Sequence, residues 1–597
     1  MAQPLRKFFT ETPKCFKGLQ GLGEKGIVLP LVLSYVLVFT VQITGLAESA
    51  SHTQRLVQSQ QNYLTSFYLA DAATQKALAA IRLYITANGS VPDNATLESI
   101  TKAPNVGPSK VTYKSLNTSS YFGSDWMNKA LTSGNYAGLN ANTRIINVAV
   151  TAEDTKNGVA HRSTVNQTIE IQAIPIFQFG IFYQGDLEIL PGINMDFIGP
   201  VHTNSDLYVG VGNGSTSTLK FDASITAYGA IVHRRKDGNV IGAGDVMIKN
   251  DSGVYKNMKN ADNTWLDGAA SDWSVEASSR WGNKVRSSVH GAKQLILPIP
   301  ASANPHILIE KKVAGESSQI QTQKIDYKAH LRIIDGVAQD KNGSVVELRY
   351  CSGGGAYNGS CPSGQSVVNP ISNSTFHNYR EAKMVKSTDI NVGLLNASPE
   401  FSKLVDAHKG VVVYFSDRRN QASVKYQDSV RLVNGSVLPN KGLTIASENP
   451  MYVKGNFNTV NKQPSGLVSD AFNILSNSWN DANSSNAGLR NKIASATSVN
   501  AVVVTGNTNT VGRQYNGGFE NIHRLHENWN NVHLTYSGSV AVLYNSQKAI
   551  GNWVCDGNHY NPPIRNWSFD PALSNPNYSI PGLPSVFNVA KAGYEAA

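Results

Sequence analysis

The sequence predicts an α+β protein: an N-terminal transmembrane helix that continues as a long amphipathic helix, then a mainly β region with β-solenoid-like rungs. Three observations predict it. Residues 27–47 form an uncharged apolar run, and residues 48–87 keep helical spacing without glycine or proline. Most of the remaining chain consists of short β-type runs separated by Gly and Asn.

The apolar run has the length of one membrane span. A helix over residues 27–47 covers about 30 Å, the thickness of a hydrocarbon core. Residues 1–26 form a basic leader with five Lys or Arg against two Glu. Because basic flanks stay inside, we expect a cytoplasmic leader in a single-pass inner-membrane protein. The bulk is then periplasmic or at the cell surface.

A cleaved secretory signal is the competing interpretation of this run. The small residues of Gly45-Leu46-Ala47 resemble a signal-peptidase site. The long basic region and the immediate continuation as a helix favour a retained membrane helix instead.

Residues 48–88 are expected to form an amphipathic stalk helix. One stripe repeats with alternating steps of four and three residues. Its members are Leu56, Gln60, Tyr63, Phe67, Ala70, Thr74, Ala77, Ile81 and Tyr84. Asn88-Gly89 supplies a stop signal. Such a stripe must pack on the protein's own globular region or on another copy.

Composition argues for an exported protein and against nucleic-acid binding. Charged residues make up 16% of the 597 positions, well below the roughly 25% of typical soluble domains. The net charge of +10 is scattered, and its densest cluster is His233-Arg234-Arg235-Lys236. The sequence shows no basic stripe interleaved with aromatic residues, so no nucleic-acid partner is predicted.

The exported part divides into three expected β-rich units. Residues 89–178 form a β-rich domain whose clearest strands are 144–151 and 163–173. Residues 179–400 form a β-solenoid-like region with insertions, because short runs at 199–210 and 219–232 are typical of stacked rungs. Residues 401–597 form a C-terminal β-rich domain with short helices, including one expected over 516–529.

The cysteines fit an oxidising compartment. Cys351 and Cys361 enclose a Gly/Ser-rich loop that could close into a disulfide. Cys15 precedes the membrane run and should stay reduced. Cys555 is left without a partner, and a buried apolar role is its default interpretation.

The sequence holds no clear catalytic constellation. His523 and His526, with Glu520 and Glu527 beside them, are the best metal-ligand candidates, but their spacing is not His-Glu-x-x-His. The simpler interpretation is the polar face of a helix. We therefore expect no enzyme activity, no metal and no cofactor.

The N-terminal segment resembles a known family. Lys25-Gly26 precedes the apolar run, and the helix contains Phe67-Tyr-Leu-Ala-Asp-Ala-Ala-Thr-Gln-Lys-Ala77. This resembles large atypical minor type IV pilins and secretion pseudopilins over residues 22–85. The resemblance implies cleavage after Gly26, so that the mature chain begins at Ile27. Major pilins carry a glutamate where this chain has Leu31, and atypical minor members also lack it.

Residues 426–567 are similar to a C-terminal domain of large pilus-assembly-like proteins, on segments such as Asn449-Pro-Met-Tyr-Val-Lys-Gly455 and Tyr515-Asn-Gly-Gly-Phe519. The leading hypothesis is thus a membrane-anchored, pilin-like structural or surface-display protein whose partners are other pilin-like subunits or assembly machinery. An adhesin that binds surface polysaccharide is the alternative, with Trp265, Trp273 and Trp281 as stacking candidates. A polysaccharide-acting enzyme is the third reading, and the rungs are poor in the carboxylates it needs.

Overall fold

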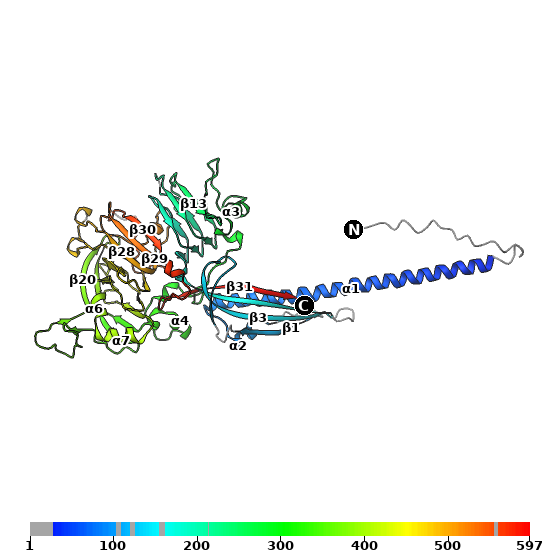
Figure 1. Ribbon diagram of the computed structural model, residues 1–597, viewed down its shortest axis with the longest axis horizontal. Helices are drawn as coiled ribbons and strands as arrows, with labels where there is room; N and C mark the ends of the chain where they lie inside the picture. Colours follow the sequence, from blue (N-terminus) through cyan, green and yellow to red (C-terminus); the bar gives the residue numbers. More distant parts are fainter. Residues whose placement is uncertain are drawn as a thin grey trace.

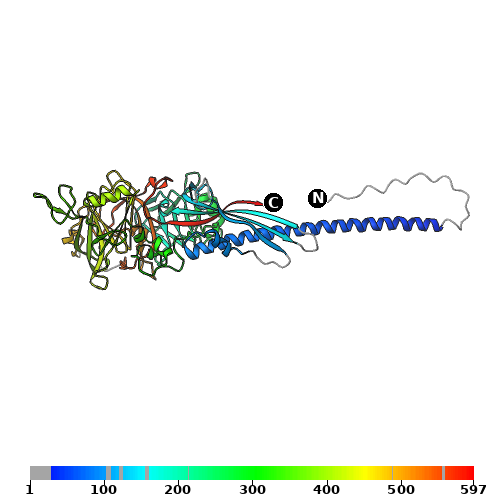
Figure 2. The same ribbon diagram turned by 90° about the horizontal axis from the view of Figure 1, so that it is seen from below.

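A computed structural model shows an elongated molecule with a long helix at one end and a mainly β region at the other. It describes residues 28–102, 109–119, 126–154, 161–212, 214–486, 488–553 and 559–596. The expected leader 1–26, the processing pair Gly26 and Ile27, and Cys15 and Cys555 lie outside these residues. Figures 1 and 2 show the helix projecting away from everything else, with a sheet along its second half.

The long helix α1 (Val28–Asn88) is continuous over 61 residues, so it spans roughly 90 Å. This confirms the prediction that the apolar run and the stalk form one helix. It ends as expected at Asn88, because Gly89 adopts φ +65° and its N–H donates to Ile85 O at 2.7 Å. Such a left-handed glycine closes a helix without strain.

The second half of α1 lies on an antiparallel sheet. In the part of the chain that the structure describes, its strand order is β1-β3-β4-β31, with β2 on β3. The bounds are β1 (Lys110–Ser119), β2 (Met127–Ala130), β3 (Asn140–Asp154), β4 (His161–Pro175) and β31 (Ser585–Ala596). The predicted strands 144–151 and 163–173 lie within β3 and β4 and are confirmed.

The helix and sheet share a hydrophobic core. Small residues of α1 meet β-branched residues of the sheet, and these side chains are buried: Ala70, Ala73, Ala77, Ile81, Ile85, Ile146, Val148, Val150, Val165, Ile169 and Ile171. The alanines allow the helix to lie close to the strands, and the β-branched residues suit the pleated surface. The helix therefore packs on its own chain here.

The predicted stripe is correct at its end and wrong at its start. Ala70, Ala77 and Ile81 are buried, whereas Leu56 and Tyr63 are 61% and 49% exposed. The buried positions there are Asn62 and Ser66. A 4-3 repeat averages 3.5 residues per turn, so it drifts about 20° per heptad against a straight helix. The sheet also leaves the segment before residue 58 uncovered.

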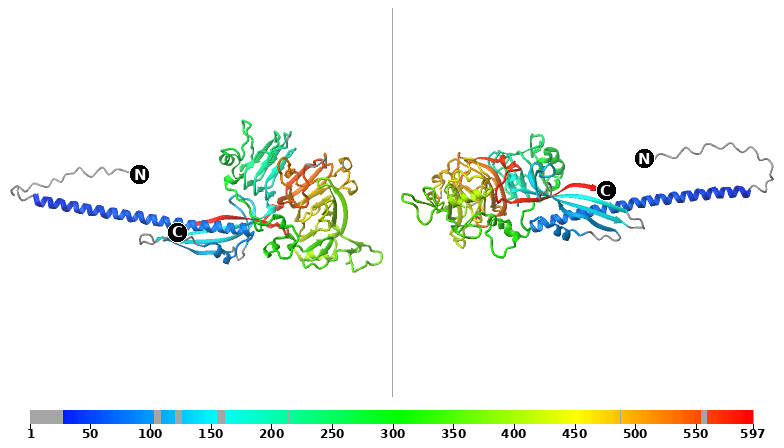
Figure 3. Two further views of the ribbon diagram at one scale, coloured as in Figure 1. Left: turned by 180° about the vertical axis from the view of Figure 1, so that it is seen from behind. Right: turned by 60° about the horizontal axis from the view of Figure 1, so that its bottom comes forward.

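The β region has two lobes, visible from both sides in Figure 3. In the first lobe, each short strand of a row pairs in parallel with a strand from the next turn of the chain. Three rows result: β5-β8-β11-β15, β6-β9-β12 and β7-β10-β13, with β14 antiparallel to β13. The bounds are β5 (Ile181–Tyr183), β6 (Leu187–Ile189), β7 (Met195–Phe197), β8 (Val201–Thr203), β9 (Leu207–Val209), β10 (Thr218–Phe221), β11 (Ile225–Ala227), β12 (Ile231–Val232), β13 (Asp245–Lys249), β14 (Tyr255–Asn257) and β15 (Val285–Arg286).

The second lobe contains two rows of longer strands. One row is β29-β28-β26-β24-β22-β16-β17, with β30 beside β29, and the other is β20-β21-β23-β25-β27. The bounds are β16 (Leu331–Ile334), β17 (Val337–Gln339), β20 (Ile371–Asn378), β21 (Lys383–Asn391), β22 (Val411–Ser416), β23 (Tyr426–Val433), β24 (Leu443–Ser447), β25 (Met451–Lys454), β26 (Ser465–Ser469), β27 (Phe472–Leu475), β28 (Thr497–Asn507), β29 (His533–Asn545) and β30 (Ile564–Phe569).

The two lobes share one sheet and one core. β29 pairs in parallel with β5, so the β5-β8-β11-β15 row of the first lobe and the β29-to-β17 row of the second form one continuous sheet. A single buried cluster likewise extends from Ile181 to Val542. This sheet includes strands from both sides of residue 400, where the sequence predicts a boundary between two β-rich units. The fold is α+β, a long apolar N-terminal helix followed by a mainly β region.

Several short helices and a two-stranded hairpin lie in the segments that connect the other elements. They are α2 (Asn94–Ile100), α3 (Trp273–Trp281), α4 (Ser318–Gln323), α5 (Ile325–Lys328), α6 (Val392–Asn396), α7 (Pro399–Ala407), and the hairpin β18 (Tyr350–Cys351) and β19 (Val367–Val368). The chain then returns to the stalk: β31 pairs with β4 along eleven positions, from Ser585 opposite Pro175 to Ala596 opposite Val165. The domain expected at 89–178 thus gains a strand from the far end of the sequence.

Candidate functional site

The first part of α1 is a candidate membrane span. Its most apolar window of 18 residues has a mean hydropathy of 1.9, and none of that window is buried against the rest of the chain. A signal sequence near an N-terminus has the same length and composition. No Lys, Arg, Asp or Glu occurs between Val28 and Ala47.

The serine and threonine hydroxyl groups of this segment are satisfied within the helix. Ser34 Oγ donates to Leu31 O at 2.8 Å, and Thr40 Oγ1 donates to Val36 O at 2.6 Å. Thr44 follows the same pattern. Unpaired polar groups are costly in hydrocarbon, so this self-pairing suits a lipid environment.

A polar pair within the apolar core helps to hold the stalk on its sheet. Ser66 Oγ and Ser163 Oγ lie 2.7 Å apart, and both residues are buried. Ser66 also donates to Tyr63 O at 2.8 Å. The pair satisfies two buried hydroxyls and fixes the helix along the strand direction.

The end of the stalk is embedded in the head. Ala301 N donates to Thr86 O at 3.2 Å, and the Gln319 side chain donates to Asn88 O. A Cβ atom at position 89 would overlap the backbone of Ile299, so Gly89 permits this close approach as well as the turn. Helix and head are therefore held together at α1's C-terminal end.

A buried carboxylate joins three segments of the head. Asp470 is fully buried. Its oxygens accept from the backbone N–H groups of Gln547 at 2.5 Å, Lys548 at 3.1 Å and Ala549 at 2.7 Å. His306 Nε2 lies 3.1 Å from Asp470 Oδ1, and His306 Nδ1 lies 2.9 Å from Glu310 Oε1.

The charge of His306 should make stability depend on pH. Burial lowers the pKa of His306, but the hydrogen bonds to Asp470 and Glu310 outweigh it and hold the pKa above 6.5. A histidine whose pKa is higher in the folded state than in the unfolded state stabilises the fold fully below its unfolded-state pKa, about 6.5. That stabilisation is lost as pH rises through the folded-state pKa. We expect the melting temperature of the full-length protein to fall as pH rises above about 6.5, and His306→Gln to flatten that slope. An unchanged slope in this variant would assign the pH dependence to other groups.

The predicted cysteine pair is joined in the structure. Cys351 and Cys361 form a disulfide with Cα atoms 5.5 Å apart. The bond closes a loop within the connection between β18 and β19. Figure 1 places this loop near α7, at the end of the molecule opposite α1.

The two candidate histidines are not on a helix, contrary to the expectation. Only Phe519–Asn521 forms a short 3-10 turn (η8), and the chain after it is irregular. Many of the residues between Ile522 and Trp529 are buried, so tertiary packing replaced the amphipathic helix that their spacing suggested.

His523 and His526 also face different neighbours. His523 packs against Tyr536 and Trp567, with ring centroids 4.4 and 4.6 Å away. His526 Nε2 lies 2.9 Å from Asn473 Oδ1. Burial lowers the pKa of His523 to about 3 and that of His526 well below 6.5, so both are neutral. Within the described ranges, no three His, Cys, Asp or Glu side chains gather as a metal site.

The three candidate stacking tryptophans do not form an exposed platform. Trp273 is 3% exposed and Trp281 is fully buried, and both belong to the head's core. Trp265 stacks on His233, with ring centroids 3.3 Å apart. These side chains hold α3 and its loops on the first lobe, and sequence alone could not distinguish that role from ligand stacking.

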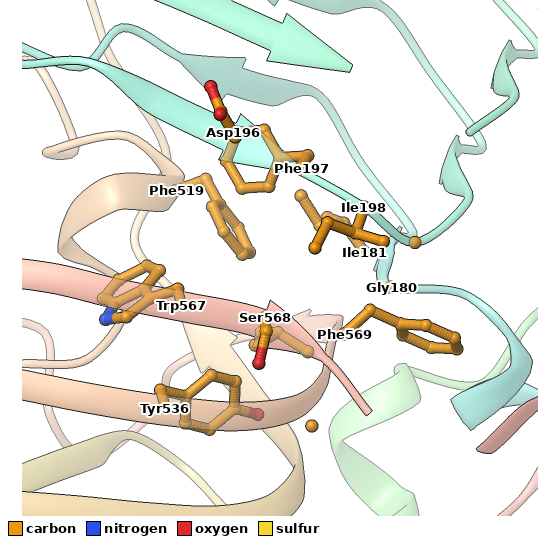
Figure 4. A pocket seen from close by; sticks show the side chains of 13 residues that line it. Gly180, Ile181, Asp196, Phe197, Ile198, Phe519, Tyr536, Trp567, Ser568 and Phe569 are labelled. Atoms are coloured by element: carbon orange, nitrogen blue, oxygen red, sulfur yellow. The ribbon is translucent and has the colours of Figure 1, made fainter. Parts of the chain in front are cut away.

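Sequence reasoning missed a small aromatic pocket between the two lobes, shown in Figure 4. Its volume of ≈ 30 Å³ is about that of one water molecule. It is lined by Phe197, Phe519, Tyr536, Trp567 and Phe569, among others. Phe197 and Phe519 meet edge to face at 5.4 Å. Its size and apolar lining make it a packing defect between the lobes.

Comparison with known proteins gives little further information. No protein-family model and no curated protein sequence matches this chain. Among solved structures it is similar to the competence-associated pilin ComZ from Thermus thermophilus, with 12% identity and a TM-score of 0.25. The match covers 90% of this chain and 97% of that one. A TM-score of 0.25 is too low to establish a common fold.

Proposed function

We propose that this protein is a pilin-like structural protein, anchored in the inner membrane by α1, that displays its β-rich head outside the cytoplasm. One observation carries the proposal: a single helix has an uncovered apolar half, and its other half is docked on an antiparallel sheet and embedded in the head. The leader would stay in the cytoplasm. The partners would be other pilin-like subunits or the machinery that assembles them.

The uncovered surface of α1 supports assembly with other copies. Beyond the apolar run, exposed apolar side chains continue at Leu56, Val57, Leu64 and Tyr68. They lie outside any span of about 20 residues that begins at Val28. Apolar side chains that neither lipid nor the chain's own sheet covers are suited to packing against another helix.

The parallel rows of the head support a β-solenoid-like scaffold, in which each turn of chain adds one strand to each row. Strands β5, β8 and β11 begin at residues 181, 201 and 225, and β6, β9 and β12 follow at 187, 207 and 231. Such rungs bury their apolar side chains only by stacking. A rigid head of stacked strands would suit display, and we propose no catalytic role for it.

The N-terminal mass of the protein from its native membrane tests the proposal. We expect a chain that begins at Ile27, because the resemblance of Lys25-Gly26 to the pilin cleavage signal implies cleavage after Gly26. Electron microscopy of surface filaments with an antibody to the head should then detect it. A chain that retains residues 1–26 would overturn pilin-type processing, and a chain that begins after Ala47 would overturn the membrane anchor as well.

A further inference from the structure

A polar cavity of ≈ 250 Å³ opens at the surface where three parallel strands end. Its walls follow β5, β28 and β29, and Asn304 and Pro305 add a side from the segment before β16. We call it the amide pocket, because six carboxamide side chains line it. They are Gln184, Asn304, Asn507, Asn509, Asn516 and Asn545.

The amide groups present hydrogen-bond donors to this cavity. Gln184 Oε1 accepts from Asn204 at 2.8 Å, Asn304 Oδ1 from His306 N at 3.0 Å, and Asn516 Oδ1 from Gly518 N at 2.8 Å. Asn507 Oδ1 accepts from Thr508 N in the same way. Across the described residues, none of the six amide nitrogens donates a hydrogen bond to the protein. Their N–H groups remain available to a ligand that carries acceptors.

The charge of the pocket disfavours an anionic ligand. Its lining in the described chain contains no Lys, Arg or His, and it contains the carboxylate of Asp186. Lys236 pairs with Asp186 at 2.7 Å and so is already neutralised. Recognition of a carboxylate or phosphate usually relies on cationic donors. The acceptors of the ligand should therefore be uncharged.

Hydrogen bonds hold several parts of the pocket wall in place before any ligand arrives. Ser546 N donates to Asn507 O at 2.9 Å, which ties the ends of β28 and β29 together. Thr510 donates to the buried Glu188 at 2.5 Å and accepts from Asn516 N at 3.1 Å. The Asp470 contacts hold His306 and residues 547–549, so they fix the wall that carries Asn304. Fixed donors bind at lower entropic cost than mobile ones.

We infer that the amide pocket binds one neutral sugar ring. Hydroxyl, ring and N-acetyl oxygens of a sugar accept from amide N–H groups, and its hydroxyls donate to Asp186. The half-buried Pro305 gives an apolar surface for the C–H face of the ring. The volume lies just below the roughly 300–1,000 Å³ of pockets for drug-sized ligands, which suits a single ring. This inference does not depend on filament assembly.

The test uses the full-length protein in a detergent without a sugar head group. Saturation-transfer NMR and calorimetry are run with glucose, galactose, mannose and N-acetylglucosamine, and with glucuronate and galacturonate as charged counterparts. At least one neutral sugar should bind saturably and more tightly than its uronate. The double variant Asn509→Ala/Asn545→Ala should weaken that binding about tenfold. Asn342→Ala, an exposed amide in a turn outside the pocket, should leave it unchanged.

Three results of the sugar and variant measurements would overturn the inference. They are no binding by any neutral sugar, tighter binding by a uronate, and affinity that the double variant does not change. Asn509 and Asn545 are exposed, so the double variant should keep its melting temperature, and its loss of affinity would not reflect unfolding. Binding of a neutral peptide such as acetyl-alanine amide in place of every sugar would also contradict it.

Discussion

Replacing Ile81 with aspartate is expected to detach the stalk from its sheet. Ile81 is fully buried between α1 and the sheet of β3 and β4. The substitution removes a large apolar side chain and places an unpaired carboxylate in its site. We expect the free energy of unfolding of this part to fall by about 4 kcal/mol or more. Chemical denaturation and limited proteolysis of residues 62–88 in the full-length protein would measure it.

Leu83→Asp provides the matched control on the same helix. Leu83 lies two residues away and is 70% exposed, so a carboxylate there stays in water. We expect a change within about 0.5 kcal/mol. Equal destabilisation by both variants would mean that helix propensity or charge, and not the stalk–sheet core, determines the effect.

Replacing Asp470 with alanine is expected to loosen the joint between the head segments. The variant loses the acceptor for three backbone N–H groups and leaves His306 without one of its two carboxylate partners. Removing one member of a buried, hydrogen-bonded charge pair costs about 3–5 kcal/mol. Thermal unfolding monitored by near-UV circular dichroism would report the loss, because Tyr544 packs on His306 at 5.2 Å.

Asp406→Ala is the control for this experiment, because Asp406 is exposed on α7. It should unfold like the unaltered protein. A further consequence separates the joint from a general loss of charge: the pH dependence assigned to His306 should become smaller in Asp470→Ala and remain in Asp406→Ala. A stable Asp470→Ala variant with the original pH slope would contradict the assigned role.

The features that sequence predicted well are those with a local physical cause. The helix from Val28 to Asn88 follows from forty residues without Gly or Pro, preceded by an apolar run, and its end follows from Gly89. Many of the short runs of the head also became strands, among them β22 and β24, because β-branched residues between turn signals favour that state.

The errors share a different cause. The buried face of α1 was predicted correctly near Ala77 and wrongly near Tyr63, because the position of the sheet decides which face of the helix is buried. The segment around His523 had helical spacing, but residues on every side of it are buried, and packing from Tyr536 and Trp567 fixed an irregular path. Trp273 and Trp281 belong to a hydrophobic core that the local sequence pattern does not predict.

The sequence by itself determined the membrane-length helix, its stop, the α+β class and the strand-forming runs, since each depends on neighbours within a few residues. Only the tertiary structure decided that β31 completes the stalk sheet, that Asp470 joins three distant segments, and that six amides meet in one pocket. These contacts join residues up to several hundred positions apart. Their free energy depends on burial and on partners that the chain acquires when it folds.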